Sequence, residues 1–300
     1  MQTLTQNNPL HGILWMLAAG ISFVGVTGIV RHLGTELPAA EAAFLRFAFG
    51  VLFLSPSLVM ALKTRQVWAQ WRLIGLRGAL HTVAVVLWFF AMARIPLAEV
   101  TAIGYLNPIV VTIGAALFLG EKLAARRLLA IGVAMIGALV ILRPGLRAIM
   151  PGHLAQLGAA LCFGLSYLVA KRLSDKFPAG ALVALLSAMV TLGLAPLAFA
   201  VWVRPEPAQV GWLALVAVFA TLGHYCMARA FAAAPLAVTQ PVIFLQLVWA
   251  SLLGGLVFGE AVDPFVLLGG GLIIAAISYM TWREAVLRRV VQTPAPHAVH

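Results

Sequence analysis

Two amide side chains occupy equivalent positions in two long apolar stretches of this 300-residue chain. Asn107 lies near the middle of 96–121, and Gln246 lies near the middle of 235–260. At ~1.5 Å per helical residue, each amide would lie about 15 Å deep, close to the midplane of a bilayer. An amide donates and accepts hydrogen bonds, so the pair could bind a polar solute. The alternative is a hydrogen bond between helices, worth under ~2 kcal/mol.

The two stretches are copies of one another. Sliding one by 139 positions aligns them without a gap and pairs Pro96 with Pro235 and Glu121 with Glu260. Two copies of a membrane-length segment, each with a polar residue at mid-depth, are typical of duplicated transporters.

Other polar residues of the two copies could line the same cavity. Thr101 and Tyr105 fall on one face of a helix, and Gln240 is the counterpart of Thr101 in the second copy. Pro108 and Pro241 each remove one helical hydrogen bond. The prolines could therefore act as hinges at a cavity, or as fixed kinks that neighbouring helices relieve.

Three basic side chains and one tyrosine lie deep in other apolar runs. His81 and His224 could exchange a proton near neutral pH, and Tyr225 lies beside the second histidine. Arg46 could receive a substrate carboxylate through two hydrogen bonds. The structural alternatives are neutral, hydrogen-bonded histidines, and an arginine that reaches toward the membrane surface or pairs with Glu41.

Aromatic and acidic residues complete the candidate set. Trp15 and Trp88 could stack on a flat substrate, or pack against neighbouring helices and lipid. Glu121 and Glu260 each follow a glycine at the end of a copy. Each carboxylate could accept backbone N–H groups at a helix start or pair with a nearby basic residue. We therefore favour a structural or gating role for these two residues over substrate contact.

The nine acidic residues all fall at or near the ends of the apolar runs. We therefore expect no buried carboxylate relay, the usual device for coupling transport to protons. Coupling would have to use a histidine, a terminal glutamate or substrate exchange. No catalytic set, metal site or cofactor is expected, because no carboxylate lies in the membrane interior to join His81 and His224.

The composition indicates a membrane protein. The chain is 63% hydrophobic and 10% charged, which excludes a soluble domain. Ten apolar runs have about the ~20 residues that a helix needs to cross hydrocarbon. These runs are 12–31, 39–60, 73–93, 97–119, 124–142, 154–172, 180–203, 211–233, 236–258 and 265–283.

The net charge of +11 is a topology signal and not a nucleic-acid surface. Most of the 20 Lys and Arg residues fall at run ends that would share a side with the N-terminus. The positive-inside rule then predicts a multi-pass protein of the cell inner membrane with both termini in the cytoplasm.

The duplication extends over nearly the whole chain, since a shift of 140 positions pairs Pro38 with Pro178. The predicted repeats are 12–145 and 152–285, and 286–300 is predicted to be a disordered cytoplasmic tail. Each repeat holds five helices, and an odd number inverts the second copy in the membrane. The expected fold is all-α, with ten transmembrane helices in two inverted five-helix repeats around a central cavity.

Two sequence features resemble the EamA-like branch of the drug/metabolite transporter superfamily. They are the run FLRF at 44–47 and the Gly-Glu pairs that end 96–121 and 235–260, set within two five-helix halves. The resemblance implies a ten-helix secondary transporter with a cavity between its halves. Members of the family move amino acids, other metabolites, vitamins such as riboflavin, or S-adenosylmethionine.

Together these features predict a transporter of a small metabolite and not an enzyme or a scaffold. It would work by alternating access, with one repeat rocking against the other. Efflux of an amino acid or related metabolite is the first expectation, and uptake of a vitamin or nucleoside-like compound is the alternative. The expected partners are the substrate and the lipid bilayer, with no nucleic acid. The spacing of Gly255 and Gly259 also allows a homodimer.

Overall fold

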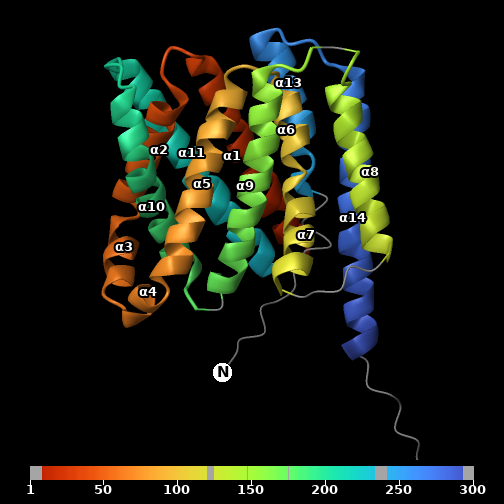
Figure 1. Cartoon of the computed structure of the whole chain (residues 1–300), viewed down its shortest axis with the longest axis horizontal. Coiled ribbons are helices and arrows are strands. Elements are labelled where there is room, and N and C mark those ends of the chain that lie inside the picture. The colour runs from red at the N-terminus through yellow and green to blue at the C-terminus, as the bar shows by residue number, and fades with distance from the viewer. Residues whose placement is uncertain (1–8, 120–124, 147, 175, 234–241, 293–300) are drawn as a thin grey trace, which may run out of the picture.

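The computed structural model describes residues 9–119, 125–146, 148–174, 176–233 and 242–292, and their regular structure is helical. The first half contains α1 (Pro9–Leu33), α2 (Ala39–Phe53), α3 (Ser55–Leu62), α4 (Arg65–Ala69), α5 (Trp71–Met92), α6 (Leu97–Gly104), α7 (Asn107–Leu119) and α8 (Ala125–Leu142). The second half contains α9 (Pro151–Ser174), α10 (Ala179–Ala200), α11 (Pro207–Ala233), α13 (Gln246–Phe258) and α14 (Pro264–Gln292). Figure 1 shows most of them standing side by side as an upright bundle.

The bundle is a polytopic membrane protein, as the composition predicts. Among the described residues, seven spans are long and apolar enough to cross a bilayer, or eight if α2 and α3 form one bent span. The shorter apolar helices Leu128–Leu142 and Gln246–Phe258 lie at two further predicted positions. Each predicted run therefore contains helix, although not every run spans a membrane by its helical length alone.

The predicted single helix over 39–60 is wrong, because the chain bends by 74° between α2 and α3. Pro56 explains the bend. It lies in the first turn of α3, has no N–H to donate and cannot continue the hydrogen bonding of α2. Proline is well tolerated at a helix start, so the chain begins a new helix at this point.

The predicted helix over 97–119 is divided into two half-helices, and the second half of the chain matches the division. α6 ends at Gly104 and α7 begins at Asn107, because Pro108 cannot donate to the Gly104 carbonyl. In the second half, a turn at 244–245 precedes α13, which begins at Gln246. Both interruptions come immediately before the predicted amide.

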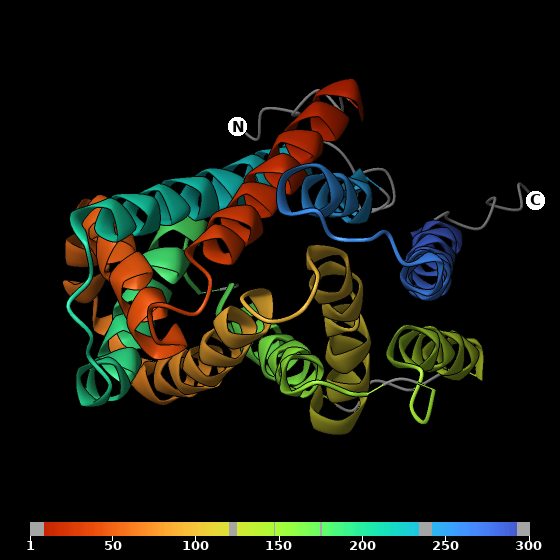
Figure 2. The ribbon, with the colours of Figure 1, turned by 90° about the horizontal axis from the view of Figure 1, so that it is seen from above.

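Helices pair across the two halves of the chain. α1 packs on α11, α5 on α9, α2 on α10 and α8 on α14. Exchanging the halves turns the first two pairs into each other and the last two into themselves, as an inverted duplication requires. Figure 2 shows α8 and α14 together at one edge of the bundle.

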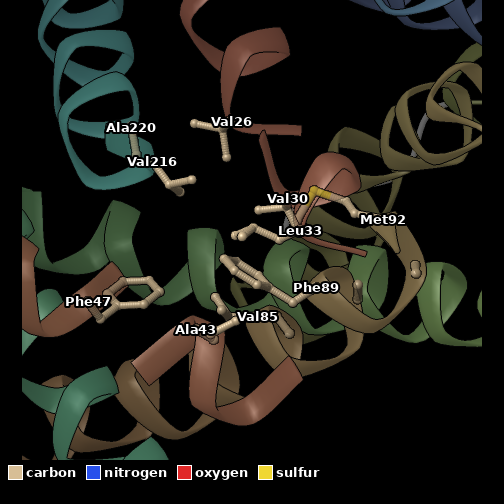
Figure 3. Packing of buried hydrophobic residues seen from close by; sticks show 14 of the residues in the cluster. Val26, Val30, Leu33, Ala43, Phe47, Val85, Phe89, Met92, Val216 and Ala220 are labelled. Carbon is tan, nitrogen blue, oxygen red and sulfur yellow. The ribbon is translucent and has the colours of Figure 1, made fainter. Parts of the chain in front are cut away.

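One buried apolar cluster joins α1, α2, α5 and α11 (Figure 3). Its members include Val30 of α1, Phe47 of α2, Phe89 of α5 and Val216 of α11. Lipid tails are as apolar as these side chains. The cluster therefore stabilises the bundle by close van der Waals packing and not by removing the side chains from water.

α8 and α14 approach closely at two facing glycines. A Cβ on Gly137 would lie 2.6 Å from the Gly269 carbonyl oxygen and 2.8 Å from Ile273 Cγ1. A Cβ on Gly269 would likewise meet the Gly137 carbonyl oxygen. Small residues allow membrane helices to pack backbone against backbone. Gly269 therefore serves a contact within the chain.

Replacing Gly137 with leucine should push α8 away from α14, because the new side chain has no space beside the α14 backbone. Overpacking of this kind costs about 1–3 kcal/mol, so the melting temperature of the detergent-solubilised protein should fall. Gly132→Leu is the matched control on the same helix, since a Cβ at Gly132 meets nothing within 4 Å. Equal melting temperatures for the two variants would contradict the importance of this contact.

Candidate functional site

Three of the predicted residues meet in one pocket. Arg46 enters from α2, His81 from α5 and His224 from α11. Ser187 of α10 adds a hydroxyl group to the lining, whereas the Thr221 hydroxyl of α11 donates to the Ala217 carbonyl of its own helix at 2.8 Å. The described residues that line the pocket include no carboxylate. The pocket can therefore offer several hydrogen-bond donors and a positive charge.

Arg46 enters the pocket with part of its guanidinium unsatisfied. The guanidinium carbon lies 3.8 Å from the centroid of the Phe47 ring, and the buried Nε has no hydrogen-bond partner. Glu41, the predicted alternative partner, instead accepts a hydrogen bond from the Val203 N–H at 3.0 Å. A buried cationic donor is costly until an acceptor satisfies it. Arg46 is therefore suited to bind a ligand oxygen or nitrogen.

One side of the His81 ring is fixed by hydrogen bonding. Nδ1 lies 3.2 Å from Ser166 Oγ, which itself donates to the Arg77 carbonyl at 3.4 Å. The single hydroxyl proton is used in that second bond, so Nδ1 carries the proton shared with Ser166. Nε2 of a neutral His81 is then an acceptor. The ring also packs against Phe163, with centroids 4.9 Å apart.

His224 and its neighbour Tyr225 point in different directions. The His224 ring packs edge-on against Phe23, with centroids 5.2 Å apart. Tyr225 is 51% exposed, and its hydroxyl accepts a hydrogen bond from Arg229 at 3.1 Å. Trp15 lies edge-on to Tyr225 and below the Arg229 guanidinium. The structure thus brings neither Trp15 nor Tyr225 to the pocket.

Trp88 supports the pocket from behind. Its ring contacts Phe89 and Phe163, each with centroids 5.9 Å apart. Phe163 in turn contacts His81. Trp88 is therefore not among the residues that line the pocket, but it packs against a residue that holds His81.

The two midplane amides lie at the helix interruptions and do not line this pocket. Asn107 begins α7, and its buried Oδ1 has no hydrogen-bond partner; Gln246 begins α13. The interruptions touch, because the Tyr105 hydroxyl donates to the Phe244 carbonyl oxygen at 3.1 Å. The two rings also pack edge-on with centroids 5.1 Å apart. Equivalent points of the two halves therefore meet at this contact.

The remaining candidates of the first half-helix are used internally or are not described. The buried Thr101 hydroxyl donates to the Leu97 carbonyl at 2.9 Å, within α6. It is therefore not available to a cavity in this conformation. Glu121, Gln240 and Pro241 lie outside the described residues.

Glu260 connects three helices. Its Oε1 lies 2.8 Å from Arg31 Nη2 of α1, and its Oε2 accepts a hydrogen bond from the Leu97 N–H at 2.9 Å. The carboxylate thus satisfies one of the unpaired N–H groups at the start of α6. That helix start belongs to the first half of the chain, so Glu260 ties the end of α13 to the opposite half.

Two of the acids that were predicted to lie near the ends of apolar runs are nevertheless buried. Glu41 is 0% exposed and Glu99 is 3% exposed. Glu99 Oε2 lies 2.5 Å from Nε2 of the buried His153. Both acids lie near helix ends, but neighbouring helices and loops cover them there. The sequence signal that could have found this pair is polar spacing, because His153 and Gln156 lie on one helix face in an apolar run.

Known proteins resemble this chain over nearly its whole length. A model of the EamA-like transporter family matches residues 10–143 and 150–282. The riboflavin transporter of Vibrio cholerae is 30% identical, covering 95% of this chain and 97% of that protein. The riboflavin transporter of Rhizobium johnstonii is 32% identical and covers 91% of each chain. The pseudopaline exporter of Pseudomonas aeruginosa is 28% identical, covering 88% of this chain and 94% of that protein.

A solved crystal structure also shares the fold. It aligns with a TM-score of 0.56 at 16% identity, covering 95% of this chain and 97% of the other. The family match falls once in each half, and the named relatives are transporters and not enzymes. The chain is a multi-pass membrane transporter of small metabolites and belongs to the EamA-like transporter family.

Proposed function

We propose that the pocket between Arg46, His81 and His224 binds the substrate, and that the substrate is a planar, acceptor-rich metabolite of the riboflavin class. The observation that carries this proposal is the pocket itself. It combines one cationic donor, two imidazoles and the Ser187 hydroxyl, and no carboxylate lies among its described lining residues. Such a lining favours a solute with several oxygen and nitrogen acceptors.

Aromatic surroundings support a flat substrate. Phe47 lies in the pocket wall below the Arg46 guanidinium. Phe163 holds the His81 ring and stacks on Tyr167, with centroids 6.1 Å apart. Rigid rings lose little conformational entropy when they bind a ring, and offset or edge-on ring pairs add about 0.5–1.5 kcal/mol each. Two relatives named riboflavin transporters support the same substrate class.

A second candidate is the export of an amino acid or another metabolite that carries a carboxylate. The buried Nε of Arg46 favours it, because a guanidinium binds a carboxylate through two parallel hydrogen bonds. The relative named as an exporter supports this direction. The two candidates share one pocket and differ in the ligand group that Arg46 would bind.

The proposed orientation places both termini in the cytoplasm of a cell with the protein in its inner membrane. Figure 1 shows α3, α4 and the last turns of α14 at the same end of the bundle. That end carries Lys63, Arg65, Arg72 and Arg283. An excess of basic residues marks the cytoplasmic side of a membrane protein. A homodimer remains a prediction from the spacing of Gly255 in α13 and Gly259 immediately after it.

Alternating access would use the two interrupted helices. The half-helices α6, α7 and α13 leave backbone groups near the contact between Tyr105 and Phe244. Interrupted helices at the meeting point of two repeats commonly line the transport path. In this proposal Asn107 and Gln246 contact the solute as it passes the interruptions, while Arg46 and the two histidines bind it in the pocket.

Purified protein in liposomes should transport riboflavin in preference to amino acids and S-adenosylmethionine. The measurement is the initial rate of labelled solute entry or exit for each compound, with empty liposomes as the control. Transport of a labelled amino acid but not riboflavin would select the second candidate. No flux of any compound would contradict the proposal.

Arg46→Met should weaken riboflavin transport by removing the buried donor. Hydrogen bonds to charged groups contribute about 1.5–3 kcal/mol, so KM should rise roughly tenfold to a hundredfold. Arg94→Met is the matched control, since Arg94 also lies over a phenylalanine ring, at 3.7 Å from the Phe90 centroid, but is exposed. If both variants retain the parental KM, Arg46 does not bind the substrate.

A further inference from the structure

A buried acid–base pair lies at the starts of α6 and α9, at the upper end of the bundle in Figure 1. Glu99 of α6 is 3% exposed and His153 of α9 is 1% exposed. Their side chains meet with Nε2 and Oε2 2.5 Å apart. Ionisable residues in the interior of a membrane protein are costly to bury and mark ion or proton pathways more often than structural sites.

The hydrogen bonds assign the proton within this pair. His153 Nδ1 accepts a hydrogen bond from the Met150 N–H at 2.9 Å, so Nδ1 carries no proton. Nε2 must then carry the proton and donate it to Glu99. The pair has one negative charge when the other oxygen of Glu99 is unprotonated, and it is neutral when that oxygen binds a proton. Its two states therefore differ by one proton.

Several charged groups at the neighbouring helix ends lie in arginine contacts. Arg31 of α1 pairs with Glu260 beside the start of α6, and Arg143 at the end of α8 pairs with Asp263. Arg94, which follows α5, is exposed and lies over the Phe90 ring. Arginine keeps its proton at every physiological pH. Among these contacts, the pair Glu99–His153 alone combines two groups that can both gain and lose a proton.

Two buried acceptors without a hydrogen-bond partner lie on α9, which carries His153, and at the start of α7, which follows α6. Gln156, one turn after His153, donates to the Val100 carbonyl at 2.9 Å, but its Oε1 is buried without a partner. Asn107 Oδ1, at the helix interruption, is buried without a partner as well. Buried water commonly satisfies such atoms. The two oxygens are thus possible hydrogen-bonding sites for water between the pair and the middle of the bundle.

We propose that Glu99 and His153 form a proton-binding site, and that this transporter carries a proton together with its substrate. The proposal rests on the proposed transport function. The proton adds to the Glu99 carboxylate, no covalent bond breaks, and His153 keeps its own proton. Opening the upper end of the bundle exposes the pair to water on that side. Neutralising the pair lowers the cost of burying it again, so proton binding favours closure around the bound substrate.

Liposomes with an imposed pH gradient and a clamped membrane potential test this site. With riboflavin as the probe, the wild-type protein should accumulate the solute on the alkaline side of the membrane, because protons flow from the acidic to the alkaline side. One proton per uncharged substrate gives about tenfold accumulation at equilibrium for each pH unit. Glu99→Gln should abolish this accumulation and retain riboflavin exchange at equal pH. Glu41→Gln is the matched control, since Glu41 is equally buried at the same end but bonds to a backbone N–H.

Each outcome decides between the two proposals. No flux of any solute by the wild-type protein overturns the transport proposal of the preceding section. If riboflavin flux is the same with and without the pH gradient, or if Glu99→Gln still accumulates riboflavin, the proton-site proposal is overturned and the transport proposal is not. If Glu99→Gln does not fold, the wild-type protein decides the question. Riboflavin added to its liposomes in a weakly buffered medium should draw protons from that medium, and an unchanged pH would overturn the proposal.

Discussion

The structure depends on one constraint, the need to satisfy every backbone N–H and C=O group in hydrocarbon. An unpaired backbone group in lipid costs several kcal/mol, so the chain stays helical wherever it faces lipid. It leaves the helix at 105–106 and at 244–245, and there each interruption is covered by the other. The Tyr105 hydroxyl supplies a donor to the Phe244 carbonyl at this meeting point. The irregular backbone of the second half thus finds a polar partner in the first half, which makes it tolerable inside the membrane.

Charge follows the same logic at the helix ends. Glu41, Glu99 and Glu260 each accept a hydrogen bond or meet a basic group from the opposite half of the chain. Each carboxylate pairs with a donor of the other half, which makes the acids structural as well as ionisable. The pocket at Arg46 is the opposite case. There a buried donor has no protein acceptor, and that imbalance is what suits the pocket to a ligand.

Much of the fold could be predicted from the sequence, because apolar runs of membrane length leave few alternatives. The bend at Pro56 was missed, since a proline in an apolar run reads equally well as a kink or as a new start. Arg46, His81 and His224 were found because each is costly in a membrane. Ser166, Ser187 and Thr221 were missed, because single hydroxyls in membrane helices commonly bond to their own backbone. Glu99 was predicted near the end of a run, where it lies, but its burial against His153 was not predicted, because a position near a helix end does not show whether neighbouring helices cover the side chain.

The pairing of α8 with α14 changes how the molecule can be divided into moving parts. Gly137 and Gly269 hold these helices backbone to backbone, yet α8 comes from the first half of the sequence and α14 from the second. α1 with α11 and α5 with α9 also join opposite halves. If each half moved as one rigid body, all of these tightly packed pairs would have to slide at once. The two sequence halves are therefore not the tightly packed units, and we expect any rigid bodies that move during transport to combine helices of both halves.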